Sequence, residues 1–163
     1  MDILFLFSSL IVLPFWLMMI VAPKWQLTRT IMHSPLVVAI PALLYAVLVI
    51  PNIGQIIPLF ANPTLVGIAP LLGTPLGATI AWVHLLTFDL FVGRRIYLDS
   101  RERQVNVWLA GIVLFLTFML GPIGYLSYLV ARRGTRPAAE SIDKLELSRF
   151  EAHNYVKYRE QPK

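Results

Sequence analysis

Residues 78–95 read ATIAWVHLLTFDLFVGRR, and this stretch is the clearest indication of the kind of fold that the chain forms. Apolar residues dominate it as far as Val92, yet it contains His84 and Asp89. A run of this kind is typical of a membrane span, where a carboxylate costs several kcal/mol unless it is paired, protonated or facing water. Ionisable residues inside membrane spans usually have a function, so Asp89 is the first candidate for a functional residue.

The composition places the rest of the chain in a membrane as well. Hydrophobic residues make up 57% of the 163 residues and charged residues 14%, whereas charged residues are about a quarter of a soluble domain. A helix needs about 20 apolar residues to cross the hydrocarbon core. We predict an all-α integral membrane fold, a four-helix transmembrane bundle at residues 1–131, followed by a basic polar C-terminal tail at 132–163. The predicted spans are residues 3–22, 35–50, 76–93 and 105–130.

The first apolar stretch is interpreted as a retained helix rather than a signal peptide. Its only early charge is Asp2, whereas a cleaved signal opens with positive residues and has a shorter apolar core. The absence of cysteine excludes disulfides, thiolate catalysis and cysteine-held metal sites.

The interval from residue 51 to residue 75 breaks the pattern. It holds five prolines and three glycines but no charged residue. A regular helix would not tolerate so many prolines, and a water-exposed loop of this length would normally carry charge. We therefore expect an interfacial or re-entrant segment whose irregular backbone is buried against protein or lines a cavity.

The placement of lysine and arginine gives two conflicting indications of topology. Six positive residues follow the first and third predicted spans, which puts these connections in the cytoplasm and the N-terminus outside. Four crossings would then put the tail outside too, yet three arginines directly follow the fourth span. The larger group favours the first arrangement.

The tail carries eight lysines and arginines against five acidic residues. Residues 141–158 have an imperfect apolar face at helical spacing, which predicts a short helix. It is either a solvated end or a helix that docks on a partner or lies at the membrane interface. The net charge of +5 suits anionic lipid headgroups, and no basic patch with interleaved aromatics indicates nucleic-acid binding.

Helical geometry separates the polar residues of the third span. His84 and Asp89 are five positions apart, about 140° around a helix, so they should flank a groove rather than bond directly. We expect Asp89 to meet an arginine or a hydroxyl from a neighbouring helix, either to fix helix packing or to face a substrate. Arg95 and Asp99 have the spacing of a surface ion pair. No spacing of histidine and carboxylates predicts a metal site.

The polar residues of the third predicted span belong to a run that resembles a known protein family. The run HLLTFDLFVGR at residues 84–94, followed by Asp99 and Arg101, resembles the core signature of the ABA4-like membrane protein family. Three further segments resemble the same family: LPFWLM at 13–18, SPLVV at 34–38 and LTFMLGP at 116–122. The resemblance covers most of residues 1–130, and its most specific part is the FDLFxGR string.

The resemblance implies a carotenoid function. Plant members of the family are implicated in the formation of neoxanthin, in which an epoxide of violaxanthin is opened to an allene. This isomerisation is redox-neutral and needs no cofactor. It implies Asp89 as the acid that protonates the epoxide oxygen, His84 or a second carboxylate as the base, and Arg94 as the group that orients Asp89 or stabilises developing charge.

The resemblance further implies a plastid or cyanobacterial membrane. The chain shows no serine- and arginine-rich transit peptide, which suggests a bacterial protein or a mature form. The alternative is a non-enzymatic accessory subunit that binds carotenoid or chlorophyll in a larger photosynthetic membrane complex, docked through its tail. His84, Trp82, Phe88 and Phe91 are then the predicted pigment contacts. A small transporter is a third and weaker hypothesis, because one Asp and one His are few residues for a proton relay across the membrane.

Overall fold

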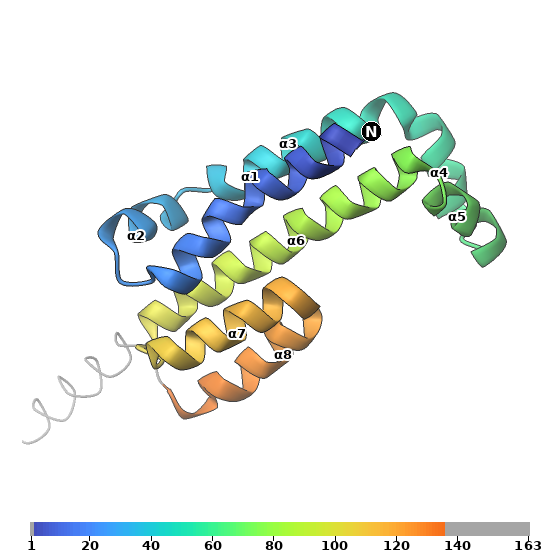
Figure 1. Cartoon of the computed structure of the whole chain (residues 1–163). Helices are drawn as coiled ribbons and strands as arrows, with labels where there is room; N and C mark the ends of the chain where they lie inside the picture. The colour runs from blue at the N-terminus through green and yellow to red at the C-terminus, as the bar shows by residue number, and fades with distance from the viewer. Residues whose placement is uncertain (1, 136–163) are drawn as a thin grey trace, which may run out of the picture.

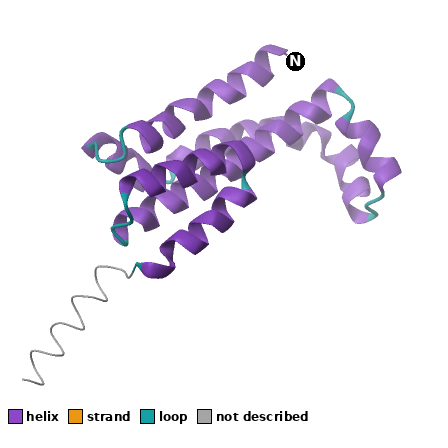
Figure 2. Ribbon diagram, turned by 60° about the horizontal axis from the view of Figure 1, so that its bottom comes forward, coloured by secondary structure: helices purple, strands orange, loops and turns teal. Residues whose placement is uncertain are grey.

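The computed structural model describes residues 2–135, so the helix expected at residues 141–158 and most of the predicted tail lie outside the described residues. Within residues 2–135 every regular element is a helix and there is no strand. The all-α prediction is therefore confirmed. Only short loops separate the helices (Figure 2).

Three helical segments are long and apolar enough to cross a membrane. They are α1 (Asp2–Val21), α3 (Leu36–Val49) continued through η1 (Ile50–Asn52) into α4 (Ile53–Ala61), and α6 (Pro75–Glu102). Their 20, 26 and 28 residues exceed or match the roughly 20 residues that a span requires. In Figure 1 α1, α3 and α6 lie side by side, with α1 and α6 running in one direction and α3 in the other. The short α2 (Gln26–His33) joins α1 to α3 at one end.

The pairing of α1 with α6 depends on small and aromatic side chains. Gly93 of α6 lies against the ring of Trp16, and a β-carbon at Gly93 would collide with that ring. Further along, Trp82 stacks on Phe5 with ring centroids 5.1 Å apart and donates a 2.9 Å hydrogen bond to the Ser9 hydroxyl. Gly93 therefore leaves the space that the Trp16 ring fills between the two spans.

The predicted fourth span, residues 105–130, is not one helix, and the four-helix bundle is not confirmed. In its place α7 (Val107–Leu120) and α8 (Pro122–Ala131) run antiparallel and pack against each other (Figure 1). With 14 and 10 residues they are about 21 and 15 Å long, short of the roughly 30 Å of a hydrocarbon core. The pair is a helical hairpin that returns to the end of the molecule from which it starts.

Glycine and proline make the turn of this hairpin. Gly121 has a φ of +47°, a conformation that favours glycine because a β-carbon would be strained there. Pro122 then occupies the first helical position of α8, where its missing N–H costs nothing. Gly124 lies so close to Thr117 of α7 that a β-carbon would collide with it. These residues turn the chain back inside the stretch that was predicted as one span, residues 105–130.

The proline-rich interval is helical rather than irregular, which corrects the prediction for residues 51–75. It forms η1 and α4, which continue the α3 segment, and α5 (Leu65–Leu72), which packs against α6 (Figure 1). Two of these helices have only eight or nine residues, so one internal proline removes few backbone hydrogen bonds. The hydroxyl of Thr74 caps α6 by accepting a 3.0 Å hydrogen bond from the Gly77 amide, and Pro75 takes its first position.

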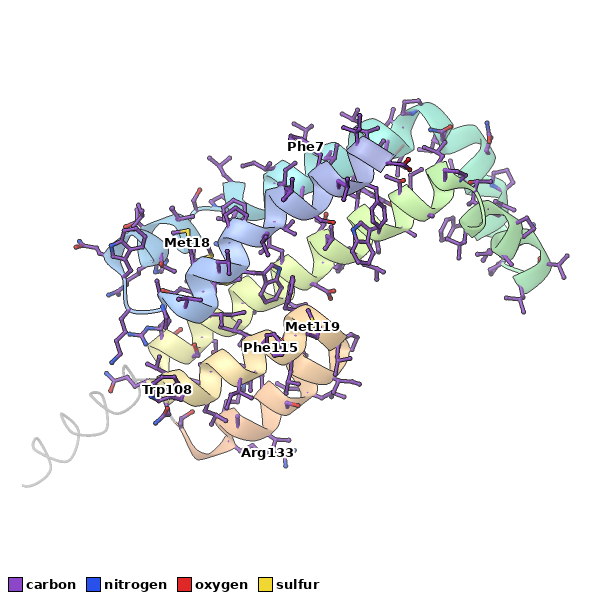
Figure 3. All side chains as sticks on the ribbon, viewed as in Figure 1. Phe7, Met18, Trp108, Phe115, Met119 and Arg133 are labelled. Atoms are coloured by element: carbon purple, nitrogen blue, oxygen red, sulfur yellow. The ribbon has the colours of Figure 1, made fainter. Side chains whose placement is uncertain are left out.

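The outer surface of the described helices is apolar. Side chains such as Phe7, Trp108, Phe115 and Met119 project outward (Figure 3), and Trp108 is 83% exposed. A continuous apolar exterior on this scale indicates contact with lipid rather than with water.

Charge gathers at one end of the molecule, which we call the basic end. It comprises the α1–α3 connection, the last turns of α6, the start of α7 and the end of α8. Every lysine and arginine of residues 2–135 belongs to it: Lys24, Arg29, Arg94, Arg95, Arg101, Arg103, Arg132 and Arg133. The hairpin thus places the arginines after residue 130 at the same end as those after the first and third spans, and the conflict between the two topology indications disappears.

Candidate functional site

Asp89 lies within the apolar part of α6, on the side nearer the basic end. It is the fifteenth of the 28 residues of α6, counted from Pro75, and Arg94 of the basic end follows about 7 Å further along the helix. Its side chain is half-buried. The interpretation of Asp89 as a carboxylate at the level of the hydrocarbon core therefore fits the described fold.

The neighbour of Asp89 is the turn of the α7–α8 hairpin. A β-carbon built at Gly121 would lie 2.8 Å from Oδ1 of Asp89. The carboxylate thus sits beside the first turn of α8, where the helix dipole favours negative charge. Gly121 serves two purposes here: it permits the positive φ, and it leaves room for the carboxylate.

Asp89 does not have the arginine or hydroxyl partner that we expected from sequence. Within residues 2–135 no hydrogen bond or ion pair joins it to another side chain; the two ion pairs there both belong to Asp99. A half-buried carboxyl group with no side-chain partner is costly in apolar surroundings. Of the four acidic residues described, Asp89 alone combines this depth with a position at a helix turn.

Arg94, predicted to orient Asp89, has another role in the structure. Its Nε donates a 2.7 Å hydrogen bond to the carbonyl of Met32, and its Nη2 donates one of 3.1 Å to the carbonyl of His33. These carbonyls end α2, where cations and donors are favoured. The guanidinium thus ties α2 to α6, and the structure does not bring it together with Asp89.

His84 lies on a different side of α6 from Asp89. Its ring is tilted against Tyr45 of α3, with centroids 5.3 Å apart, and against Phe88, at 4.8 Å. His84 and Phe88 are both exposed on the outer surface. These three rings form an outward-facing aromatic cluster on α3 and α6, which is the described feature most suited to stacking on a flat ligand.

The predicted pigment contacts divide between two surfaces. Trp82 is engaged with α1 through Phe5 and Ser9, whereas Phe88 belongs to the outer cluster with His84. Phe91 is 51% exposed. The structure therefore brings together two of the four predicted contacts, His84 and Phe88.

A polar cluster at the basic end was missed by sequence reasoning. Asp99 accepts hydrogen bonds from Tyr128 Oη at 2.5 Å, from Arg103 Nε at 3.0 Å and from Arg132 Nη1 at 3.1 Å. The predicted partner Arg95 is not among them. The 3.0 Å hydrogen bond to Asp99 raises the pKa of Arg103. The spacing of Asp99 and Arg103 is itself i, i+4, so the sequence contained the pair, but only the hairpin brings Tyr128 and Arg132 to it.

The Asp99 cluster holds the hairpin in place. Tyr128 and Arg132 belong to the end of α8, and Asp99 and Arg103 to the end of α6. Tyr128 is 1% exposed, so this hydroxyl is not available to a ligand. We interpret the cluster as the anchor that fixes α8 on α6 and keeps the hairpin turn beside Asp89.

The three long apolar helices and the lipid-facing surface define a helical membrane protein. Comparison with known families is specific: the model of the ABA4-like family, described as ABA DEFICIENT 4-like, matches residues 3–128. The chain belongs to the ABA4-like family, and the predicted resemblance is confirmed.

One curated relative extends this result. The chain is 33% identical over 129 residues to the protein ABA DEFICIENT 4, chloroplastic, of Arabidopsis thaliana. The aligned region covers 74% of this chain and 56% of the relative, so the chain spans a little over half the length of that protein. No solved structure matches.

Proposed function

We propose that this protein acts on a carotenoid within the membrane, as a xanthophyll isomerase that opens an epoxide to an allene. Family membership supports a carotenoid-related role. The observation that carries the proposal is the Asp89 carboxyl group, which has no side-chain partner in the described residues and lies in the apolar part of α6 beside the Gly121 turn. A lipid-soluble ligand with a polar end group is a reason to keep a carboxyl group there.

The proposed reaction transfers one proton within the substrate. Protonated Asp89 gives its proton to the epoxide oxygen while the carbon–oxygen bond breaks, and a base removes a proton from the adjoining polyene to form the allene. Substrate and product have the same composition, so no oxidant or reductant is needed.

The second proton transfer falls to Asp89 itself. His84 faces Tyr45 on another side of α6, and Asp99 is bonded within its own cluster. After it has given up its proton, the Asp89 carboxylate is the base at hand, so one carboxyl group takes both steps in turn. The start of α8 beside it stabilises the carboxylate between the two steps.

The second candidate function is a non-enzymatic accessory subunit that binds carotenoid or chlorophyll in a photosynthetic membrane complex. The outward-facing cluster of Tyr45, His84 and Phe88 favours it, because exposed aromatic rings stack on pigments and an exposed imidazole is a ligand for the magnesium of chlorophyll. In this candidate the tail docks on the complex, in a cyanobacterial or plastid membrane.

Pigment analysis separates the two candidates. The chain is expressed in a host that accumulates violaxanthin, alongside Asp89→Asn, His84→Ala and the matched control Asp2→Asn, whose carboxylate is exposed at the N-terminus. The isomerase proposal expects an allenic xanthophyll from the wild type and from the control but not from Asp89→Asn. Identical pigments with wild type and Asp89→Asn would contradict it.

Gentle detergent purification tests the accessory-subunit candidate. That candidate expects stoichiometric pigment to co-purify with the wild type and to be lost from His84→Ala. Migration as a free small protein without pigment would rule it out.

A further inference from the structure

A cavity of about 860 Å³ opens at the basic end, between the α1–α3 connection and the α6–α7 connection. Its charged lining consists of Lys24, Arg29 and Arg101 against the single carboxylate of Glu102. Within residues 2–135 none of these three cations takes part in an ion pair, whereas Arg103 and Arg132 share Asp99. The cavity therefore carries an excess of positive charge that the described protein does not neutralise.

An apolar groove of about 610 Å³ adjoins this cavity. It runs between the end of α1 and one face of α7, and shares Pro23, Lys24 and Val107 with the cavity. Further from the basic end, Ile112 and Phe115 of α7 line it, and the outward position of Phe115 is visible in Figure 3. Polar cavity and apolar groove thus form one continuous surface that runs from the basic end along the outside of the helices.

The shared wall of the two hollows is held by hydrogen bonds. The Tyr97 hydroxyl donates to the carbonyl of Pro23 at 2.9 Å, and the Thr28 hydroxyl donates to the carbonyl of Ala22 at 2.9 Å. Both side chains are buried, at 1% and 0% exposure. The connection between α1 and α2 is therefore fixed in shape, and binding need not first order it.

We propose that this surface binds one anionic phospholipid. Its phosphate lies among Lys24, Arg29 and Arg101, and an acyl chain lies in the groove along α7. The order of chemistry along the surface, cations followed by apolar side chains, matches that of a lipid molecule at a membrane interface. Three cations against one carboxylate select an anionic headgroup over a zwitterionic one. This site is separate from Asp89 and does not depend on the proposed isomerase function.

Native mass spectrometry of the full chain in detergent micelles tests the site. Phosphatidylglycerol and phosphatidylcholine with identical acyl chains are the probes, and the variants are the pair Arg29→Gln with Arg101→Gln and the single Lys24→Gln. The matched control is the pair Arg95→Gln with Arg133→Gln, two exposed arginines of the basic end that do not line the cavity; Arg133 is labelled in Figure 3.

We expect the wild type to retain phosphatidylglycerol in preference to phosphatidylcholine. Removing the two cavity arginines should weaken phosphatidylglycerol binding about thirtyfold, removing Lys24 about fivefold, and the control pair should stay within about threefold of wild type. An equal loss in the control pair would overturn the site, since it would mean attraction to the basic end as a whole. Displacement of the lipid by millimolar inorganic phosphate would also overturn it, because the groove would then contribute nothing.

Discussion

Replacing Gly121 by alanine should destabilise the protein far more than a glycine-to-alanine change elsewhere. Gly121 has a φ of +47°, and a non-glycine residue in such a conformation costs about 1–2 kcal/mol. The new β-carbon would also lie 2.8 Å from Oδ1 of Asp89, so the carboxylate must leave its rotamer, at a further cost of about 1 kcal/mol. Together these terms predict a loss of about 2–3 kcal/mol in the free energy of unfolding.

Equilibrium unfolding in mixed micelles measures this loss, with Gly134→Ala as the matched control. A β-carbon at Gly134 meets nothing within 4 Å, so the control should change the free energy of unfolding by less than about 0.5 kcal/mol. In the background of Asp89→Ala, the cost of Gly121→Ala should fall by about 1 kcal/mol, because the carboxylate is gone and the backbone strain remains. Equal effects of Gly121→Ala and Gly134→Ala, or an undiminished cost without the Asp89 carboxylate, would refute the placement of the hairpin turn.

Three further substitutions test other contacts of the fold by the same unfolding measurement. Tyr128→Phe removes the hydroxyl that donates the 2.5 Å hydrogen bond to Asp99, and should lower the free energy of unfolding by about 2 kcal/mol. The control Tyr125→Phe, at an exposed position, should cost almost nothing. Equal effects of the two substitutions would mean that the Asp99 cluster contributes no stability. Arg94→Gln removes the two hydrogen bonds to the carbonyls that end α2 and should lower the free energy of unfolding by about 2 kcal/mol. Pigment conversion per folded molecule should stay unchanged. A variant that is fully stable but no longer converts the pigment would restore Arg94 to a catalytic role. Gly93→Ala should cost about 1–3 kcal/mol by overpacking against the tryptophan of α1, and a value no larger than that of Gly54→Ala would argue against close α1–α6 packing.

Hydropathy predicts the spans well where the sequence is simple. Residues 3–22 correspond closely to α1, because a long apolar run without charge has few other stable structures in a membrane. The third span was placed at residues 76–93, whereas α6 continues to Glu102. Arg94 and Arg95 ended the apolar pattern but not the helix, since the last turns of a span extend into the polar interface.

The hairpin lies beyond what periodicity and hydropathy can predict. An apolar run of 26 residues, 105–130, is compatible with one span or with two packed half-helices, and both have the same composition. The choice depends on the φ of Gly121 and on the fit of Gly124 against Thr117, which are tertiary features. A Gly-Pro pair such as Gly121-Pro122 is compatible with a kinked single helix as well as with a complete turn.

Only part of the candidate site could be predicted from the sequence, because the rest of it depends on tertiary contacts. Asp89 could be singled out because its cost in apolar surroundings follows from sequence alone. Its neighbour Gly121 is 32 positions away, and the acceptors of Arg94 are 61 and 62 positions away. Residue spacing along one helix cannot predict contacts that depend on how several helices pack.

Labelling of single introduced cysteines shows whether α7 and α8 form a hairpin that returns to the basic end, because the chain has no cysteine of its own. Lys24→Cys, Asn62→Cys and Arg133→Cys introduce one exposed thiol each, and a membrane-impermeant maleimide reports the side on which each lies. A hairpin that returns to the basic end predicts that Cys at 24 and 133 share one side, protected in intact cells by the positive-inside rule, while Cys at 62 is labelled from the other. Labelling of position 133 together with position 62 would mean a complete fourth span, and would contradict the placement of the hairpin turn at Asp89.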